Sequence, residues 1–90
     1  MYVIVSYDIS DDTLRKNIAN LLEDNGKRVQ YSVFECHLDA KRLEGLIVEL
    51  DRFVEDNDSI RIYQICEACL KKMVMLGRCE SLQEPDFYIV

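Results

Sequence analysis

The segment Tyr2–Asp8 restricts the fold more than any other part of this chain. It contains three β-branched residues and two aromatic residues, with no charged side chain before the final aspartate. Such a composition is typical of a strand buried on both faces at the centre of a sheet. Residues that favour the start of a helix follow, which places Asp8 at the carboxyl end of the strand. That position often holds a functional group in α/β proteins, whereas an Asx-type hydrogen bond that closes the turn explains the aspartate equally well.

Length and charge predict one acidic domain. The chain has 90 residues, and a domain this small is often stabilised further by forming oligomers. The formal net charge of −6 argues against strong non-specific attraction to nucleic acid, because phosphates favour a positively charged partner. No apolar run approaches the roughly 18 residues that span a bilayer, and no signal peptide is recognisable. We therefore expect a cytoplasmic protein that contacts no membrane and keeps its cysteines as thiols.

Apolar periodicity predicts two helices with extended chain between them. The first helix follows the capping residues at 10–13, has apolar residues at positions 14, 18, 21 and 22, and ends at Gly26 in a left-handed conformation. The second follows Asp39 and continues to about residue 54, and Gly45 in its interior indicates a close approach by another segment. Between them, the apolar phase shifts between Val33 and Phe34, which predicts a bulge or a reversal between two short strands.

The remaining segments complete a recognisable order of elements. Residues 59–66 read as a strand, 67–72 as a helical turn, 73–76 as a short strand, and 79–86 as a polar connector. The last four residues are apolar, and we expect them to add a strand to a sheet edge of this chain or of a partner. This order predicts an α+β ferredoxin-like sandwich (βαββαβ), in which an antiparallel sheet carries two helices on one face. Residues 1–78 form that domain, and 79–90 form the connector and an extra C-terminal strand.

Few residues stand out as candidates for chemistry. Asp8 has no second acid in its own strand, and one carboxylate holds a divalent cation poorly unless a two-fold dimer brings its copy opposite. Cys66 and Cys69 have the spacing of a zinc knuckle or a redox pair. The other potential zinc ligands form no second pair, and the motif follows no thioredoxin-like pattern, so buried thiols are favoured over both. His37 is the only histidine, and a capping or surface role explains it better than catalysis.

Two groups of basic residues, at positions 15, 16, 27 and 28 and at 71, 72 and 78, suggest nucleic-acid contacts or, more simply, solvated faces. The aromatic residues Tyr7, Tyr31 and Phe34 can stack on bases or pack in the core.

Three stretches together resemble a known family. Tyr7-Asp8-Ile9 precedes two acids and a helix, residues 28–36 read Arg-Val-Gln-Tyr-Ser-Val-Phe-Glu-Cys, and residues 60–63 read Ile-Arg-Ile-Tyr. This pattern is similar to the small CRISPR-associated adaptation protein, the second of the two universal proteins of spacer acquisition in antiviral defence. The resemblance covers nearly the whole chain. It implies a ferredoxin-like homodimer in which the C-terminal strand pairs with the partner's sheet.

The resemblance also implies an activity and its residues. Asp8 corresponds to the family's metal-binding residue, and two copies across the dimer axis would hold Mg²⁺ or Mn²⁺. Some members cleave single-stranded RNA or double-stranded DNA, whereas others act mainly as a structural bridge between integrase dimers. The residues at positions linked to activity in some members are Tyr7, Arg15, Arg28 and Phe34. The expected function is thus a metal-dependent endoribonuclease or endonuclease that works with the CRISPR integrase. The alternative is a non-catalytic dimeric scaffold that bridges integrase dimers and holds the incoming DNA. A small-ligand regulatory domain of the same fold is a third hypothesis.

Overall fold

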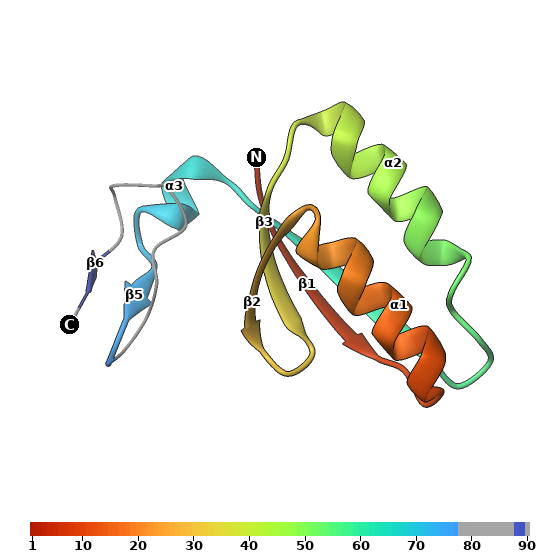
Figure 1. The fold of residues 1–90 in the computed structure, drawn as a ribbon. Coiled ribbons are helices and arrows are strands. Elements are labelled where there is room, and N and C mark those ends of the chain that lie inside the picture. Colours follow the sequence, from red (N-terminus) through yellow and green to blue (C-terminus); the bar gives the residue numbers. More distant parts are fainter. Residues whose placement is uncertain (78–87, 90) are drawn as a thin grey trace.

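The four-stranded antiparallel sheet of the predicted ferredoxin-like sandwich is present in the structure, a computed structural model that describes residues 1–77, 88 and 89 (Figure 1). The strands of this sheet lie in the order β2-β3-β1-β4, and α1 and α2 lie together on one face. The elements are β1 (Tyr2–Asp8), α1 (Asp12–Glu23), β2 (Gly26–Gln30), β3 (Val33–His37), α2 (Ala40–Asp51), β4 (Ser59–Ile65), α3 (Glu67–Leu70), β5 (Val74–Met75) and β6 (Tyr88–Ile89). The βαββαβ prediction is therefore confirmed.

β1 is an inner strand, but the helices cover only one of its faces. Val5 lies opposite Phe34 of β3 on one side and opposite Ile62 of β4 on the other. Val3, Val5 and Tyr7 are buried beneath the helices, whereas Ile4 and Ser6 are half-buried on the other face. The prediction of burial on both faces is thus wrong for most of the strand. Tyr2 is the exception, because it is buried near Leu70 of α3.

Both long helices begin where their capping residues predict. The side chain of Asp11 accepts a hydrogen bond from the Leu14 backbone N–H at 3.0 Å, and Asp39 accepts one from the Arg42 N–H at 2.7 Å. These bonds satisfy amide groups that the first helical turn leaves without a partner. α2 ends at Asp51, earlier than predicted, and the chain then continues through turns to β4.

The segment between the helices differs from the prediction in two details. The reversal lies at residues 31–32, before Val33, and the irregularity in strand pairing falls between Arg28 and Gln30. Gly26 is the first residue of β2 and does not adopt the left-handed conformation predicted for a helix stop. A Cβ atom at Gly26 would lie 2.3 Å from the Glu35 carbonyl oxygen. Glycine is needed there because the two strands approach closely.

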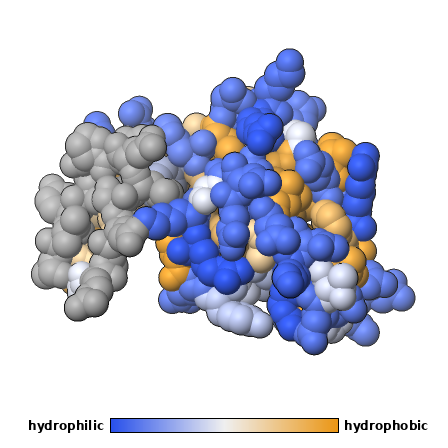
Figure 2. All heavy atoms as spheres, in the orientation of Figure 1, coloured by the Kyte–Doolittle hydropathy of each residue, from blue (hydrophilic) through white to orange (hydrophobic). Residues whose placement is uncertain are grey.

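One core joins the helices to the sheet. Its buried members include Val3, Val5, Tyr7, Ile9, Ile18, Ala19, Leu22, Phe34, Cys36, Leu38, Leu43, Leu46 and Leu50. Hydrophilic residues cover much of the helical face that Figure 2 shows, with apolar residues visible between them. The long helices are therefore amphipathic, as their periodicity predicts.

The C-terminal part forms a second, two-stranded sheet. β5 and β6 pair in parallel, with Val74 opposite Tyr88 and Met75 opposite Ile89. The helical turn and the short strand predicted before residue 77 are confirmed as α3 and β5. The predicted connector at 79–86, which includes Cys79, lies outside the described residues, as do Arg78, Phe87 and Val90. Among residues 1–77, 88 and 89, no helix has the length and apolar character to cross a membrane.

Candidate functional site

Asp8 lies on the sheet face opposite α1 and α2. Side chains alternate along a strand, so the burial of Tyr7 beneath the helices directs Asp8 to the other face. Asp8 is exposed at the end of β1 and lies opposite Ser59 of β4. We call this side the open sheet face and define it by Ile4, Ser6, Asp8, Val33, Glu35, Arg61 and Tyr63.

The Asp8 carboxylate does not close the turn that follows it. Within the described part of the chain it makes no hydrogen bond or ion pair, whereas Asp11 caps α1. The Asx-type explanation of Asp8 is therefore wrong in this structure. An exposed carboxylate without a partner keeps its oxygens available for a cation or a proton.

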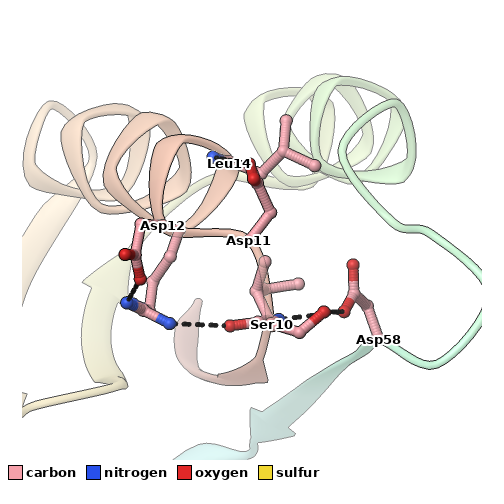
Figure 3. A network of polar contacts seen from close by, with 7 residues as sticks. Ser10, Asp11, Asp12, Leu14 and Asp58 are labelled. Carbon is pink, nitrogen blue, oxygen red and sulfur yellow. Dashed lines mark hydrogen bonds and ion pairs between the residues drawn. The ribbon is translucent and has the colours of Figure 1, made fainter.

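The turn after Asp8 is held by Asp58, from the loop between α2 and β4 (Figure 3). Asp58 Oδ1 accepts hydrogen bonds from the Ser10 backbone N–H at 3.0 Å and from Ser10 Oγ at 3.1 Å. Its Oδ2 accepts from the Glu55 N–H at 3.1 Å. The hydrogen bond from the Ser10 backbone is the main cause that lowers the pKa of Asp58. Sequence reasoning missed this role, because residues 57–59 indicated only the end of an element.

Arg15 holds the same turn from the helical side. Its Nη1 donates to the Ile9 carbonyl oxygen at 3.0 Å, and its Nη2 donates to the Asp12 carboxylate. Partial desolvation lowers the pKa of Arg15, but the combined effect of Tyr31 and Asp12 outweighs it and raises the pKa. Arg15 therefore stays charged and fixes the backbone next to Asp8.

The other residues that the resemblance singled out lie on the helical side of the sheet. Tyr7 and Phe34 are buried and stacked, with ring centroids 6.3 Å apart, and the Arg28 guanidinium lies 5.2 Å from the centre of the Phe34 ring. The Tyr7 hydroxyl donates to the Tyr31 carbonyl oxygen at 3.5 Å. The structure thus brings Tyr7, Arg28 and Phe34 together but directs the Asp8 side chain to the opposite face.

A shallow cavity of about 380 Å³ opens beside this cluster, and we call it the basic groove. It is lined by Tyr7, Asp12, Arg15, Lys16, Ala19, Asn20, Glu23, Arg28 and Tyr31. Three of these residues are basic, Asp12 and Glu23 are acidic, and Tyr31 is 72% exposed. Because Arg15 is paired with Asp12, Lys16 and Arg28 are the cations of this groove that are suited to bind phosphate, and the Tyr31 ring is suited to stack on a base.

One chain supplies an incomplete metal site. Among the described residues, no group of three or more histidine, cysteine or acidic side chains is arranged to hold a metal ion. The Asp8 oxygens are the hard ligands that Mg²⁺ and Mn²⁺ prefer, but one carboxylate is too few. The residues fit such a cation only if a second chain contributes its own Asp8.

The cysteines and the histidine lie away from Asp8. Cys36 is buried in the core, and burial raises the pKa of its thiol to about 11. Cys66 and Cys69 are exposed, so the prediction of buried thiols is wrong for this pair. Both follow the end of β4, which pairs with the start of β1. His37 lies exposed at that same end, with its ring 6.2 Å from the ring of Tyr2.

The family model described as CRISPR associated protein Cas2 matches residues 1–73. The chain belongs to the Cas2 family. A Cas2 relative from Chloroflexus aurantiacus, named CRISPR-associated endoribonuclease Cas2 1, is 42% identical over 93 residues that cover both chains completely. The CRISPR-associated endoribonuclease Cas2 of Mycobacterium tuberculosis is 41% identical, over 98% of this chain and 78% of its own. The resemblance noted in the sequence is therefore confirmed.

Solved Cas2 structures have the same fold. The crystal structure of Streptococcus pyogenes Cas2 matches with a TM-score of 0.72 and 30% identity, over 86% of this chain and all of the other. A chain of a partial Cas6-RT-Cas1–Cas2 complex matches with a TM-score of 0.67 and 29% identity, over 78% of this chain and 83% of the other. These Cas2 neighbours agree with the ferredoxin-like α+β fold described above.

Proposed function

We propose that this Cas2 chain is a metal-dependent endonuclease of CRISPR spacer acquisition, acting as a homodimer on single-stranded RNA or double-stranded DNA. The observation that carries the proposal is the exposed, unpartnered Asp8 carboxylate at the end of an inner strand. The names of the relatives support the reaction class, because they are called endoribonucleases.

The open sheet face supports a dimer that brings two Asp8 residues together. Ile4 and Val33 are half-buried on this face, and Tyr63 is 49% exposed. Packing this surface on a second copy would bury apolar area, which favours association. Two carboxylates at close range disfavour joint ionisation, and a shared cation would relieve that repulsion.

Mg²⁺ or Mn²⁺, when bound, would polarise the phosphodiester and lower the pKa of a bound water. The side chains of this protein have other tasks. Arg15 holds the Ile9 carbonyl oxygen and thereby the turn that carries Asp8. Lys16 and Arg28, which are exposed in the basic groove, bind the phosphates of the nucleic-acid backbone. Tyr7 and Phe34 are buried and act by packing beneath Arg28.

Cleavage assays with Asp8→Asn test this function. Wild-type protein is expected to cut RNA or duplex DNA with Mg²⁺ or Mn²⁺ but not with a chelator. Asp8→Asn removes the charge with little change in shape, and cleavage should fall at least about 100-fold, because even outer-shell partners of a metal account for 10–100-fold. Asp24→Asn is the matched control, since Asp24 is exposed at the C-terminal end of α1, whereas Asp8 precedes the N-terminal end of that helix. Cleavage that survives in Asp8→Asn would overturn the proposal.

A structural role in the cytoplasm beside an integrase is the second candidate. It is favoured by the net charge of −6, by the solitary carboxylate, and by the structural neighbour whose title describes a Cas6-RT-Cas1–Cas2 complex. We propose that this chain likewise contacts a Cas1 integrase. Spacer acquisition in cells that carry Asp8→Asn separates the two roles. Normal acquisition favours the structural role, whereas its loss in a dimer that still binds the integrase favours the nuclease.

A further inference from the structure

Two exposed thiols lie together where the chain leaves the four-stranded sheet. Cys66 directly follows β4 and caps α3, and Cys69 lies within α3. This end of β4 pairs Ile65 with Tyr2, whereas Asp8 pairs with Ser59 at the other end. The thiol pair is therefore separate from the proposed nuclease site.

The start of α3 brings the two thiols close together. The Cys69 backbone N–H donates to the Cys66 sulfur at 3.4 Å. The two side chains are also hydrogen-bonded to each other, which places the two sulfurs next to one another at the start of α3. A disulfide needs Cβ atoms about 3.5–4.5 Å apart, whereas residues three apart on a helix have Cβ atoms about 5–6 Å apart. Closing the bond therefore requires a small shift of the backbone at Cys66, which is the N-cap of α3 and has an extended conformation.

The surroundings of the two sulfurs differ in a way that assigns their roles. The hydrogen bond from the Cys69 backbone, followed by one from its side chain, lowers the pKa of the Cys66 thiol. The side-chain hydrogen bond to Cys66 raises the pKa of the Cys69 thiol. Thiolate is the attacking form, so Cys66 is suited to attack and Cys69 to resolve. Cys36 is buried and its pKa is raised, so it is not suited to attack a disulfide in place of Cys66.

We propose that Cys66 and Cys69 form a reversible intramolecular disulfide by exchange with a low-molecular-weight disulfide of the glutathione class. The Cys66 thiolate attacks one sulfur of that disulfide, forms a mixed disulfide and displaces one thiolate. Cys69 then loses its proton to solvent, attacks the Cys66 sulfur and displaces the second thiolate. In balance, two cysteine thiols are oxidised, one external disulfide is reduced, and the released thiolates take up the protons. Disulfides of cytosolic proteins are usually transient and redox-sensing, which matches an exposed pair.

The bond would fix the direction in which the chain leaves the sheet. α3 is a single short helix between β4 and β5, and it is anchored by the buried Leu70. Leu70 lines a cavity of about 340 Å³ together with Tyr2 and Cys66. Closing the Cys66–Cys69 ring restricts the unwinding of this turn, so oxidation stabilises the path toward β5. Amide hydrogen exchange at residues 68–70 is therefore expected to slow.

The test uses the full chain with Cys79→Ser, which removes the one cysteine outside the described residues. The protein is equilibrated in buffers of graded reduced and oxidised glutathione, quenched with acid, alkylated and analysed by peptide mass. The Cys66 and Cys69 thiols should disappear together, while Cys36 stays reduced. With Cys69→Ser added, a mixed disulfide should accumulate on Cys66. With Cys66→Ser added, the first reaction should slow roughly tenfold.

Three results would overturn the proposal. One is a pair that stays reduced in buffers that fully oxidise a control dithiol. Another is oxidation that stops at mixed disulfides in the chain with both cysteines. The third is equal reaction rates for Cys66→Ser and Cys69→Ser. Circular dichroism checks that the variants fold, and unchanged exchange at residues 68–70 on oxidation would refute the effect on α3.

Discussion

At the scale of single residues, Asp58 holds the turn that follows Asp8. Its carboxylate accepts from Ser10 and Glu55 and joins the turn after β1 to the loop before β4. Asp58→Asn replaces one accepting oxygen by a donor and removes the charge, so it should loosen that turn. We expect a lower midpoint in urea at pH 7 and weaker metal-dependent cleavage. Asp56→Asn, in the same exposed loop, is the control and should change neither.

The pH dependence of stability gives a second readout for Asp58. Its pKa is lowered in the folded chain, so its contribution is fully present above the unfolded value of 3.8 and is lost as the pH falls through the folded value. The difference in stability between wild type and Asp58→Asn should therefore shrink when the pH falls from 5 to below about 3. A difference that stays constant over this window would show that the charge of Asp58 is not what holds the loop.

Sequence reasoning located Asp8 but not the residues that support it. Asp8 was identified from its place at the end of an apolar strand, which is a local signal. Asp58 and Ser10 are 48 residues apart, and nothing local in the sequence indicates that contact. The opposite directions of Tyr7 and Asp8 were predictable, because neighbours in a strand point to opposite faces. The resemblance grouped them as one site, whereas the fold separates them.

At the scale of elements, alanine substitution at two glycines should change the stability of the fold in opposite directions. A methyl group at Gly26 would lie 2.3 Å from the Glu35 carbonyl oxygen and 2.6 Å from the Cys36 sulfur. Gly26→Ala should therefore force β2 away from β3 and destabilise the fold by about 1–3 kcal/mol. At Gly45 in α2, no side chain or other segment of the described residues lies within 4 Å of the added Cβ, apart from the two chain neighbours of Gly45. Gly45→Ala should stabilise the chain by about 0.5–1 kcal/mol.

Thermal or urea unfolding of the two variants measures this difference. For a chain of this size, 1 kcal/mol corresponds to a change in melting temperature of about 4–8 °C. A neutral effect of Gly26→Ala would contradict the close approach of β2 to β3, whereas destabilisation by Gly45→Ala would contradict the open space beside Gly45 in α2.

The elements themselves were predicted best where periodicity extends over several turns. α1 and α2 follow from their apolar spacing, and Asp11 and Asp39 are the N-caps that precede their first residues. The prediction was less accurate near Gly26 and Gly45, because a glycine satisfies several different local constraints. The pairing of β2 with β3 shows that Gly26 is needed because the two strands approach closely. The exposed position of Gly45 on α2 shows that no segment approaches it, contrary to the prediction.

At the scale of the whole molecule, the proposed dimer explains why a chain with one candidate carboxylate would be active. We expect the open sheet face to be the contact surface. Tyr63→Glu places a charge in the middle of that face, beside Ile4, and should weaken self-association about 30-fold or more. Val48→Glu is the matched control, since Val48 is 55% exposed on the helical side and Tyr63 is 49% exposed. Sedimentation equilibrium gives the dissociation constant for each variant.

The same variants connect association to chemistry. If two Asp8 carboxylates hold the cation, cleavage by Tyr63→Glu should rise with protein concentration and recover when dimers form again, because the second ligand comes from the other chain. Val48→Glu should cleave like wild type at every concentration. Suppose Tyr63→Glu is monomeric and yet fully active. The cation would then be held within one chain, and the proposal that two chains each contribute an Asp8 carboxylate would be refuted.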